Sequence, residues 1–166
     1  FHTPFPKMVE YAFASFLIHD WRGLPRWNKI IAEIGPEPSR ENLTDVEFYV
    51  SESYKTFRKS FTGTVEFRKE YEEKVADSLT TLRNIGNSYT ASVWLGVTSH
   101  FERRRDDLEG RRFGIASYGS GSSAIVCSFT VQPEYKEVAK ELSLLRELSQ
   151  KHKISPFAQG FVYSKN

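Results

Sequence analysis

The chain contains the stretch Tyr118-Gly119-Ser120-Gly121-Ser122-Ser123, a glycine–serine loop that separates two apolar runs at residues 113–117 and 124–131. Short runs rich in β-branched and aromatic residues predict strands that are buried on at least one face. Two glycines let a backbone approach a ligand closely, and the hydroxyl of Ser120 between them can donate or accept a hydrogen bond. An ordinary β-turn has the same composition, so the loop by itself does not distinguish a turn from a binding loop.

The composition fits one globular domain. The chain has 166 residues, 39% of them hydrophobic and 27% charged, which favours a folded chain with a sizeable core over a disordered one. A net charge of +2 is too small to favour nucleic acid or a membrane surface as a partner. The sequence has no apolar run of membrane-spanning length and no signal-peptide pattern, and its single cysteine suits a reducing compartment. We therefore expect a cytoplasmic protein without nucleic-acid or membrane partners.

Four segments have the apolar spacing of helices. Residues 7–21 are apolar on most sides and follow Pro6, which suits a first helical turn, so they predict a buried helix. Residues 65–83 place apolar side chains at steps of three and four, and residues 88–101 are again apolar nearly all round. Residues 133–151 predict a last amphipathic helix with an inner face formed by Tyr135, Val138, Leu142 and Leu145.

Other segments have less regular patterns. Residues 22–62 contain several prolines and a short helical piece, and Val46–Val50 within this region predicts a short strand. Residues 102–112 mix arginines with acidic residues, which favours a solvated connector over a phosphate-binding patch. The tail at 157–163 predicts a final strand.

Several catalytic patterns are absent from the sequence. Glycines flank Ser120 directly instead of lying two residues away on each side, so the nucleophile elbow of hydrolases is not present. The sequence also lacks a phosphate-binding loop and a dinucleotide fingerprint. The four histidines have no ligand pair at helical spacing, so we expect no metal site. Cys127 lies inside an apolar run, where a thiol usually acts as a small hydrophobic side chain.

Two polar segments besides the glycine–serine loop could carry chemistry. His2 comes just before the predicted helix at 7–21, and an imidazole that titrates near neutrality can polarise or protonate a carbonyl. Lys7 in the first turn opposes the helix dipole, which makes more sense if an anion such as a phosphate arrives nearby. In the second segment, Asn87 could simply cap the next helix, or its amide could face a ligand and stabilise a developing oxyanion.

In this order, the three segments resemble the C-terminal half of hydroxymethylglutaryl-CoA synthase. The resembling stretches include Phe1-His2-Thr3-Pro4-Phe5-Pro6-Lys7-Met8, Gly86-Asn87-Ser88-Tyr89-Thr90 and Ser117-Tyr118-Gly119-Ser120-Gly121. The resemblance implies an α/β, thiolase-like fold, in which this chain is the C-terminal half with a mixed sheet and buried and covering helices. Residues 1–166 would form one such domain, with an insertion-like region at 22–62.

The same resemblance implies the chemistry of an acyltransferase. A cysteine is acetylated by acetyl-CoA, a glutamate removes a methyl proton, and the carbanion attacks acetoacetyl-CoA in the mevalonate route to isoprenoids. The CoA thioesters are substrates, and no cofactor is implied. His2 would be the catalytic residue that polarises the attacked carbonyl. Lys7 would contact CoA, Asn87 would hydrogen bond the bound acyl group, and Ser120 would meet the acetoacetyl or product acyl group.

The chain also departs from the family. The nucleophilic cysteine and the glutamate base belong to the family's first half, which this sequence lacks, and Cys127 lies beyond the glycine loop and cannot replace the nucleophile. We therefore expect the chain alone to be inactive. Its partner would be an N-terminal half, in the same chain or as a separate subunit of a homodimeric enzyme, and without it apolar surface would be exposed.

Two alternatives stay open. Tyr11 stands where eukaryotic members carry a second lysine, which slightly favours a polyketide β-branching synthase that acts on acetoacetyl-acyl carrier protein. The other alternative, from a different functional class, is a non-catalytic remnant that binds an acyl-CoA.

Overall fold

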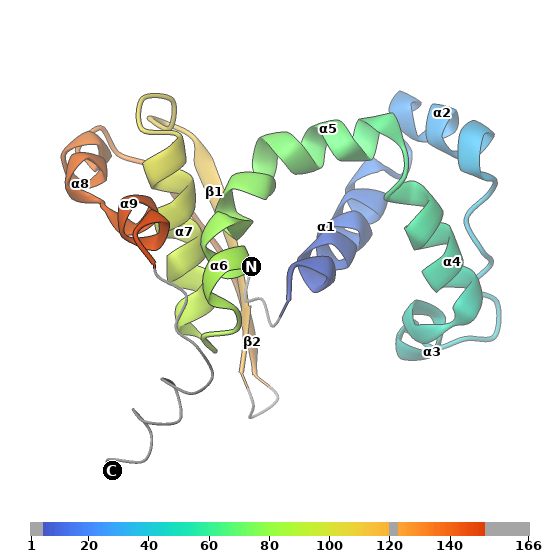
Figure 1. Cartoon of the computed structure of the whole chain (residues 1–166). Coiled ribbons are helices and arrows are strands. Elements are labelled where there is room, and N and C mark those ends of the chain that lie inside the picture. The colour runs from blue at the N-terminus through green and yellow to red at the C-terminus, as the bar shows by residue number, and fades with distance from the viewer. Residues whose placement is uncertain (1–4, 120–122, 152–166) are drawn as a thin grey trace, which may run out of the picture.

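The chain folds into two lobes joined by helix α5 (Figure 1). The structure, a computed structural model, describes residues 5–119 and 123–151. We call the first part the helical lobe; its elements are α1 (Pro6–Trp21), α2 (Pro25–Ile34), α3 (Asp45–Val50), α4 (Glu52–Phe61) and α5 (Val65–Lys74). We call the second part the hairpin lobe; its elements are the 3-10 helix η1 (Ala76–Leu79), α6 (Thr80–Ile85), α7 (Ala91–Arg103), β1 (Arg112–Tyr118), β2 (Ala124–Thr130), α8 (Tyr135–Glu141) and α9 (Leu144–Ser149).

Aromatic side chains form the centre of the helical lobe. Phe61 is fully buried, and its ring meets those of Trp21 and Phe67 edge-on at centroid distances of 5.6 and 5.4 Å. Edge-to-face contacts of this kind are favourable beyond the area that they bury. The cluster continues through Val75 to Leu79 and therefore anchors the start of the hairpin lobe.

Helix α1 begins at Pro6, as its sequence predicts, because proline suits the first turn. One side of the helix is buried through residues such as Val9, Phe13 and Leu17. The prediction of a fully buried helix is wrong, since Phe16 on the other side is 62% exposed. Helix α1 therefore has a buried apolar side and an exposed side that also carries apolar residues.

The predicted strand at Val46–Val50 is instead helix α3. A capping box determines its start: the backbone N–H of Glu47 donates to Thr44 Oγ1 at 3.3 Å, and the N–H of Thr44 donates to Glu47 Oε2 at 2.8 Å. These bonds satisfy donors that the first helical turn leaves free. At α4 the Ser51 hydroxyl accepts the backbone N–H of Tyr54 at 3.2 Å, so region 22–62 is helical over much of its length.

The predicted helix at 65–83 is broken after Lys74. Val75 has φ −125°, and the chain continues as η1 and α6 instead of one straight helix. The apolar spacing survives this break, because Tyr71, Val75, Leu79 and Leu82 are all buried. The periodicity identified the buried face correctly and missed the bend.

The strands around the glycine–serine loop are confirmed. They pair antiparallel with Phe113 opposite Phe129, and these rings stack 5.5 Å apart. Within residues 5–119 and 123–151 the sheet contains this one pair, which is smaller than the mixed sheet expected. Strand β2 is not buried as predicted: Ile125 and Val126 are 65% and 81% exposed, and Cys127 is exposed as well.

Helix α7 packs against η1 at a very short distance. A Cβ built on Gly96 would lie 3.3 Å from the backbone oxygen of Ser78, so any side chain at this position would require the backbone of η1 to shift. The predicted last helix is interrupted at Leu142 and forms α8 and α9. Its expected inner face is wrong in part, because Tyr135 is buried while Val138 is 59% exposed.

Among the described residues, the structure has no helix that is long and apolar enough to cross a membrane. The strand predicted at 157–163 lies outside the described residues.

Candidate functional site

Lys7 lies in the first turn of α1, as predicted. Its Nζ donates to Oε1 of Glu10 at 2.9 Å and lies 4.9 Å from the centre of the Tyr11 ring. The carboxylate offsets the unfavourable placement of a cation at the positive end of a helix dipole. The Lys7 side chain is still 48% exposed, so it can reach a ligand.

Two arginines from distant helices join Lys7 around Tyr11 and Glu10. Arg68 of α5 donates to the same Glu10 oxygen at 3.2 Å, and the guanidinium of Arg58 of α4 lies 4.8 Å from the centre of the Tyr11 ring. The sequence analysis did not identify these arginines, because they are far from Lys7 along the chain. The sequence shows only that Arg58 and Arg68 are cationic; it does not show that their helices pack against α1.

Asn87 lies in the turn between α6 and α7. Its Oδ1 accepts the backbone N–H of Tyr89 at 2.9 Å, while Gly86 has φ +84° and Tyr89 has φ +53°. A left-handed conformation at a non-glycine residue costs free energy and must be held by its surroundings. The Asn87 side chain therefore shapes this turn from an exposed position and does not cap the helix directly.

His2 and Ser120 lie outside the described residues. At the base of the loop that contains Ser120, the N–H of Gly119 donates to the backbone oxygen of Ser123 at 2.8 Å. Lys7 and Asn87, the two predicted site residues that are described, do not hydrogen bond each other; each uses a local partner.

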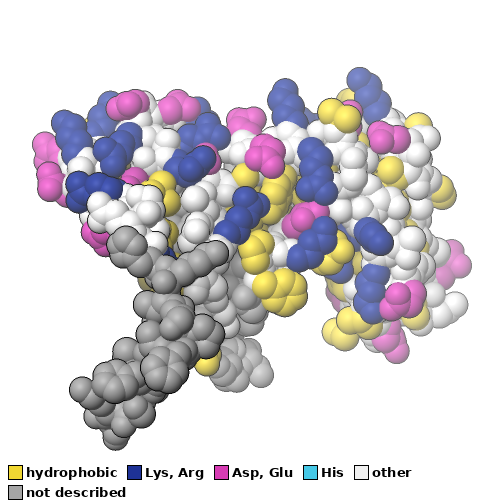
Figure 2. All heavy atoms as spheres, viewed as in Figure 1, with side chains coloured by type: hydrophobic (Ala, Val, Ile, Leu, Met, Phe, Trp, Pro, Cys, Tyr) yellow, Lys and Arg dark blue, Asp and Glu magenta, His cyan; other side chains and the backbone are white. Residues whose placement is uncertain are grey.

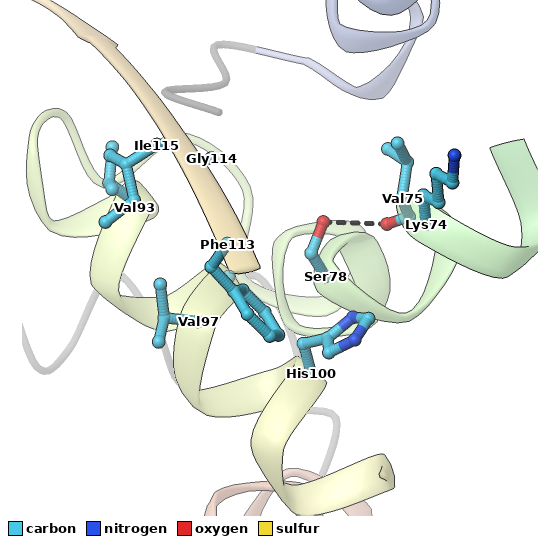
Figure 3. A pocket seen from close by; sticks show the side chains of 10 residues that line it. Lys74, Val75, Ser78, Val93, Val97, His100, Phe113, Gly114 and Ile115 are labelled. Carbon is cyan, nitrogen blue, oxygen red and sulfur yellow. Dashed lines mark hydrogen bonds between the residues drawn. The ribbon is translucent and has the colours of Figure 1, made fainter. Parts of the chain in front are cut away.

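A small cavity of about 60 Å³ lies between η1, α7 and β1 (Figure 3). His100 and Phe113 point toward each other at its edge, with ring centroids 5.1 Å apart, and the Ser78 hydroxyl donates to Val75 O at 2.7 Å. His100 is 7% exposed, and this burial lowers its pKa below the usual value of 6.5. The cavity is large enough for water and too small for an acyl-CoA.

Asp77 on η1 connects this region to the end of α7. Its two carboxylate oxygens accept hydrogen bonds from Nε of Arg103 at 2.7 Å and Nε of Arg104 at 2.6 Å. Burial disfavours the charged carboxylate, but the bonds from Arg104 and Arg103 outweigh that effect and lower the pKa of Asp77. Because both carboxylate oxygens accept hydrogen bonds from arginines, Asp77 links η1 to the end of α7 and has a structural role.

Comparison with known proteins identifies the family. The sequence-family model described as 'hydroxymethylglutaryl-coenzyme A synthase C terminal' matches residues 1–162 of the chain. The chain belongs to this family. The hydroxymethylglutaryl-CoA synthase of Saccharomyces cerevisiae is 32% identical over 153 residues, which cover 91% of the chain and 29% of that protein. That of Schizosaccharomyces pombe is 32% identical over 157 residues, covering 94% of the chain and 33% of the relative.

The hydroxymethylglutaryl-CoA synthase fold is also seen in a solved structure. MvaS in complex with 3-hydroxy-3-methylglutaryl coenzyme A is similar with a TM-score of 0.53 and 27% identity, over 69% of this chain and 26% of that one. The thiolase-like fold class predicted from the sequence is therefore confirmed. The chain spans about a third of the length of the curated relatives that it matches.

Proposed function

We propose that this chain is the acetoacetyl-CoA-binding part of a hydroxymethylglutaryl-CoA synthase, which condenses acetyl-CoA with acetoacetyl-CoA in the mevalonate route. The match of the family's C-terminal model to residues 1–162 is the observation that carries this proposal, because it includes all four predicted site residues in one continuous stretch. CoA thioesters are the substrates, and the reaction needs no cofactor.

In this proposal His2 polarises the carbonyl oxygen under attack, and Ser120 meets the acyl group. Asn87 donates from its amide to the bound acyl group. Its Oδ1 is engaged by the Tyr89 N–H, so the Nδ2 group is left to donate, without a protein partner among the described residues. A donor that is already oriented before the reaction stabilises developing negative charge at no cost of reorganisation.

The complete enzyme needs an N-terminal part, in the same chain or as a separate subunit, because this chain spans about a third of the length of its relatives. That part supplies the cysteine nucleophile and the glutamate base. The exposed apolar residues of this chain support such a partner, since Phe16, Trp94 and Val126 are 62%, 66% and 81% exposed. The chain alone then binds a hydrophobic dye and does not catalyse condensation.

The test is a condensation assay on the full-length synthase that contains this chain, or on the chain co-expressed with an N-terminal part. Asn87→Ala should lower kcat by about 10²–10³-fold, because one oriented donor is lost. Asn84→Ala is the matched control; its Nδ2 donates to Thr80 O at 2.8 Å within α6, so activity should persist. Full activity of Asn87→Ala would refute the role of this amide, and absence of condensation in the wild type would refute the function.

A second candidate is condensation on an acetoacetyl group carried by acyl carrier protein. Tyr11, in place of a second lysine four residues after Lys7, favours it. Comparing acetoacetyl-CoA with acetoacetyl-acyl carrier protein as acceptors in the same assay distinguishes the two. Binding of acetoacetyl-CoA without turnover of either acceptor would instead indicate a non-catalytic remnant.

A further inference from the structure

The start of α1 carries more positive charge than its carboxylate can balance. Lys7 and Arg68 share one oxygen of Glu10, at 2.9 and 3.2 Å, and Lys7 Nζ and the guanidinium of Arg58 both lie within 5 Å of the centre of the neighbouring Tyr11 ring, at 4.9 and 4.8 Å. Glu10 is buried, whereas the side chains of Lys7 and Arg68 are each 48% exposed. Two cations therefore share one carboxylate, and a third, Arg58, is linked to this pair through the Tyr11 ring.

Arg58 has no carboxylate partner within residues 5–119 and 123–151. Its side chain donates to the Ser15 hydroxyl at 3.4 Å and stacks on two rings, 4.8 Å from the centre of Tyr11 and 5.7 Å from that of Tyr54. Stacking holds the guanidinium in one orientation, so less rotamer entropy is lost when it binds an anion. Burial also leaves its Nε without an acceptor among the described groups.

Arg40, in the same lobe, is a stacked arginine whose charge is paired with a carboxylate. It also lies over two rings, at 4.8 Å from Phe48 and 5.3 Å from Tyr49, but its guanidinium donates to Asp45 at 2.6 Å. Stacking on aromatic rings is therefore common to both arginines. The missing carboxylate distinguishes Arg58 from Arg40.

We propose that Lys7, Arg58 and Arg68 form a binding site for a phosphate ester, namely the phosphate of the carrier that delivers the acyl substrate. This inference rests on the proposed function and adds two residues to it. A guanidinium binds phosphate through two parallel N–H donors, and a lysine adds a point charge. Arg58 then supplies, from α4, a further cation on the same Tyr11 ring that Lys7 contacts.

Hydrophobic side chains frame this site. Phe5 and Met8, which flank Lys7 along the chain, are 55% and 40% exposed, and Figure 2 shows hydrophobic side chains near the surface where Figure 1 places the start of α1. Charged groups beside an apolar surface suit a ligand with a phosphate at one end and an acyl chain at the other. Coenzyme A and the phosphopantetheine arm of a carrier protein share this chemistry.

The first experiment measures binding of adenosine 3′,5′-bisphosphate, the phosphate-bearing end of CoA, to the complete synthase by isothermal titration calorimetry. Arg58→Gln should weaken its binding about 10-fold or more, and Arg68→Gln should weaken it in the same direction, because each removes a charge-assisted contact. Arg58→Lys should recover part of the loss. Arg40→Gln is the matched control and should bind like the wild type.

The second experiment separates the two carriers by steady-state kinetics. Arg58→Gln should raise KM for acetoacetyl-CoA and leave KM unchanged for the acetoacetyl thioester of N-acetylcysteamine, which has no phosphate. If the wild type does not bind the nucleotide, but Arg58→Gln raises KM for acetoacetyl-acyl carrier protein, the phosphate is that of the carrier-protein arm and the site still stands.

Two results would overturn the site. One is equal weakening by Arg40→Gln and Arg58→Gln, which would mean that overall charge and not a built site attracts the anion. The other is an Arg58→Gln variant that keeps wild-type nucleotide binding and wild-type KM for both carriers. Arg58-dependent nucleotide binding in a protein without condensation activity would support the site and refute the proposed function, so the two failures are distinguishable.

Discussion

The helical lobe and the hairpin lobe differ in how much of their apolar surface the chain itself buries. In the helical lobe, aromatic residues such as Phe48, Phe61 and Phe67 are fully buried within one continuous core. The hairpin lobe has a small separate core of Leu108, Val131, Tyr135 and Ala139, and β2 remains largely exposed. Because burial of apolar surface is the main stabilising term, the helical lobe should be the more stable part of the chain.

The largest effect is expected in the aromatic core. Phe61→Ala removes a fully buried ring that contacts Trp21, Trp27 and Phe67. It should lower the free energy of unfolding by about 3–5 kcal/mol, measured by urea denaturation of the chain. Val65→Ala, at a position that is 77% exposed, should change it by less than about 0.5 kcal/mol. Equal effects of the two substitutions would contradict a core centred on Phe61.

A smaller effect is expected in the hairpin lobe. Phe113→Ala removes a half-buried ring that contacts Phe129, Phe101 and His100, and it should cost about 2 kcal/mol because less area is lost from the core. Hydrogen exchange should speed up in β1 and β2 and not in α4. If exchange increased throughout both lobes, they would be one cooperative unit and the comparison would fail.

Helix capping in the helical lobe gives a smaller change. Thr64 Oγ1 accepts the N–H of Phe67 at 3.3 Å and donates to Phe61 O at 2.9 Å, in a buried position. Thr64→Ala should therefore lower the free energy of unfolding by about 1 kcal/mol. Thr90 precedes α7 without a side-chain cap bond, so Thr90→Ala should have almost no effect; thermal melting of both variants measures the difference. A reversed order would show that these caps do not stabilise the helices.

The hairpin lobe should lose stability in acid because of His100 in α7, with little effect at neutral pH. Burial lowers the pKa of His100; Asp77 opposes this shift, while Arg104 and Arg111 reinforce it. The unfolded state, with a pKa near 6.5, then binds more protons, so stability is full above this value and falls as pH drops below it toward the lowered pKa of the folded state.

His100→Leu should flatten this dependence when urea midpoints are compared from about pH 8 to about pH 5. The exposed His19 provides the control, and His19→Gln should keep the acid sensitivity of the wild type. An unchanged profile in His100→Leu would exclude His100 as the group responsible.

The comparison also explains what the sequence could predict. Local patterns were sufficient for α1, the strand pair and the buried face through Tyr71 and Leu79, because each depends on neighbours along the chain. The strand predicted at Val46–Val50 was wrong although Thr44 and Glu47 already had the spacing of a capping box. The exposure of Cys127 could not be predicted, because it depends on what covers β2.

The candidate site residues were chosen in a similar way. Lys7 and Asn87 were selected from short motifs that resemble the family, and their roles stay predictions; the structure places them at the start of α1 and in the turn before α7. Arg58, which we propose as a further site residue, was not among these candidates, because its contact with α1 joins residues 43 positions apart, as its bond to Ser15 shows. Long-range packing of this kind leaves no periodic signal in the sequence.

The crossing of α7 and η1 at Gly96 restricts which sequences this fold can accept. In a library of all single substitutions, variants at position 96 should be depleted, beginning with alanine, because an added methyl group would press on the Ser78 backbone oxygen. At Gly114, where an added Cβ would meet nothing within 4 Å, alanine should be tolerated. Selection on such a library would therefore map how closely α7 and η1 pack within the hairpin lobe, independently of any assay of catalysis.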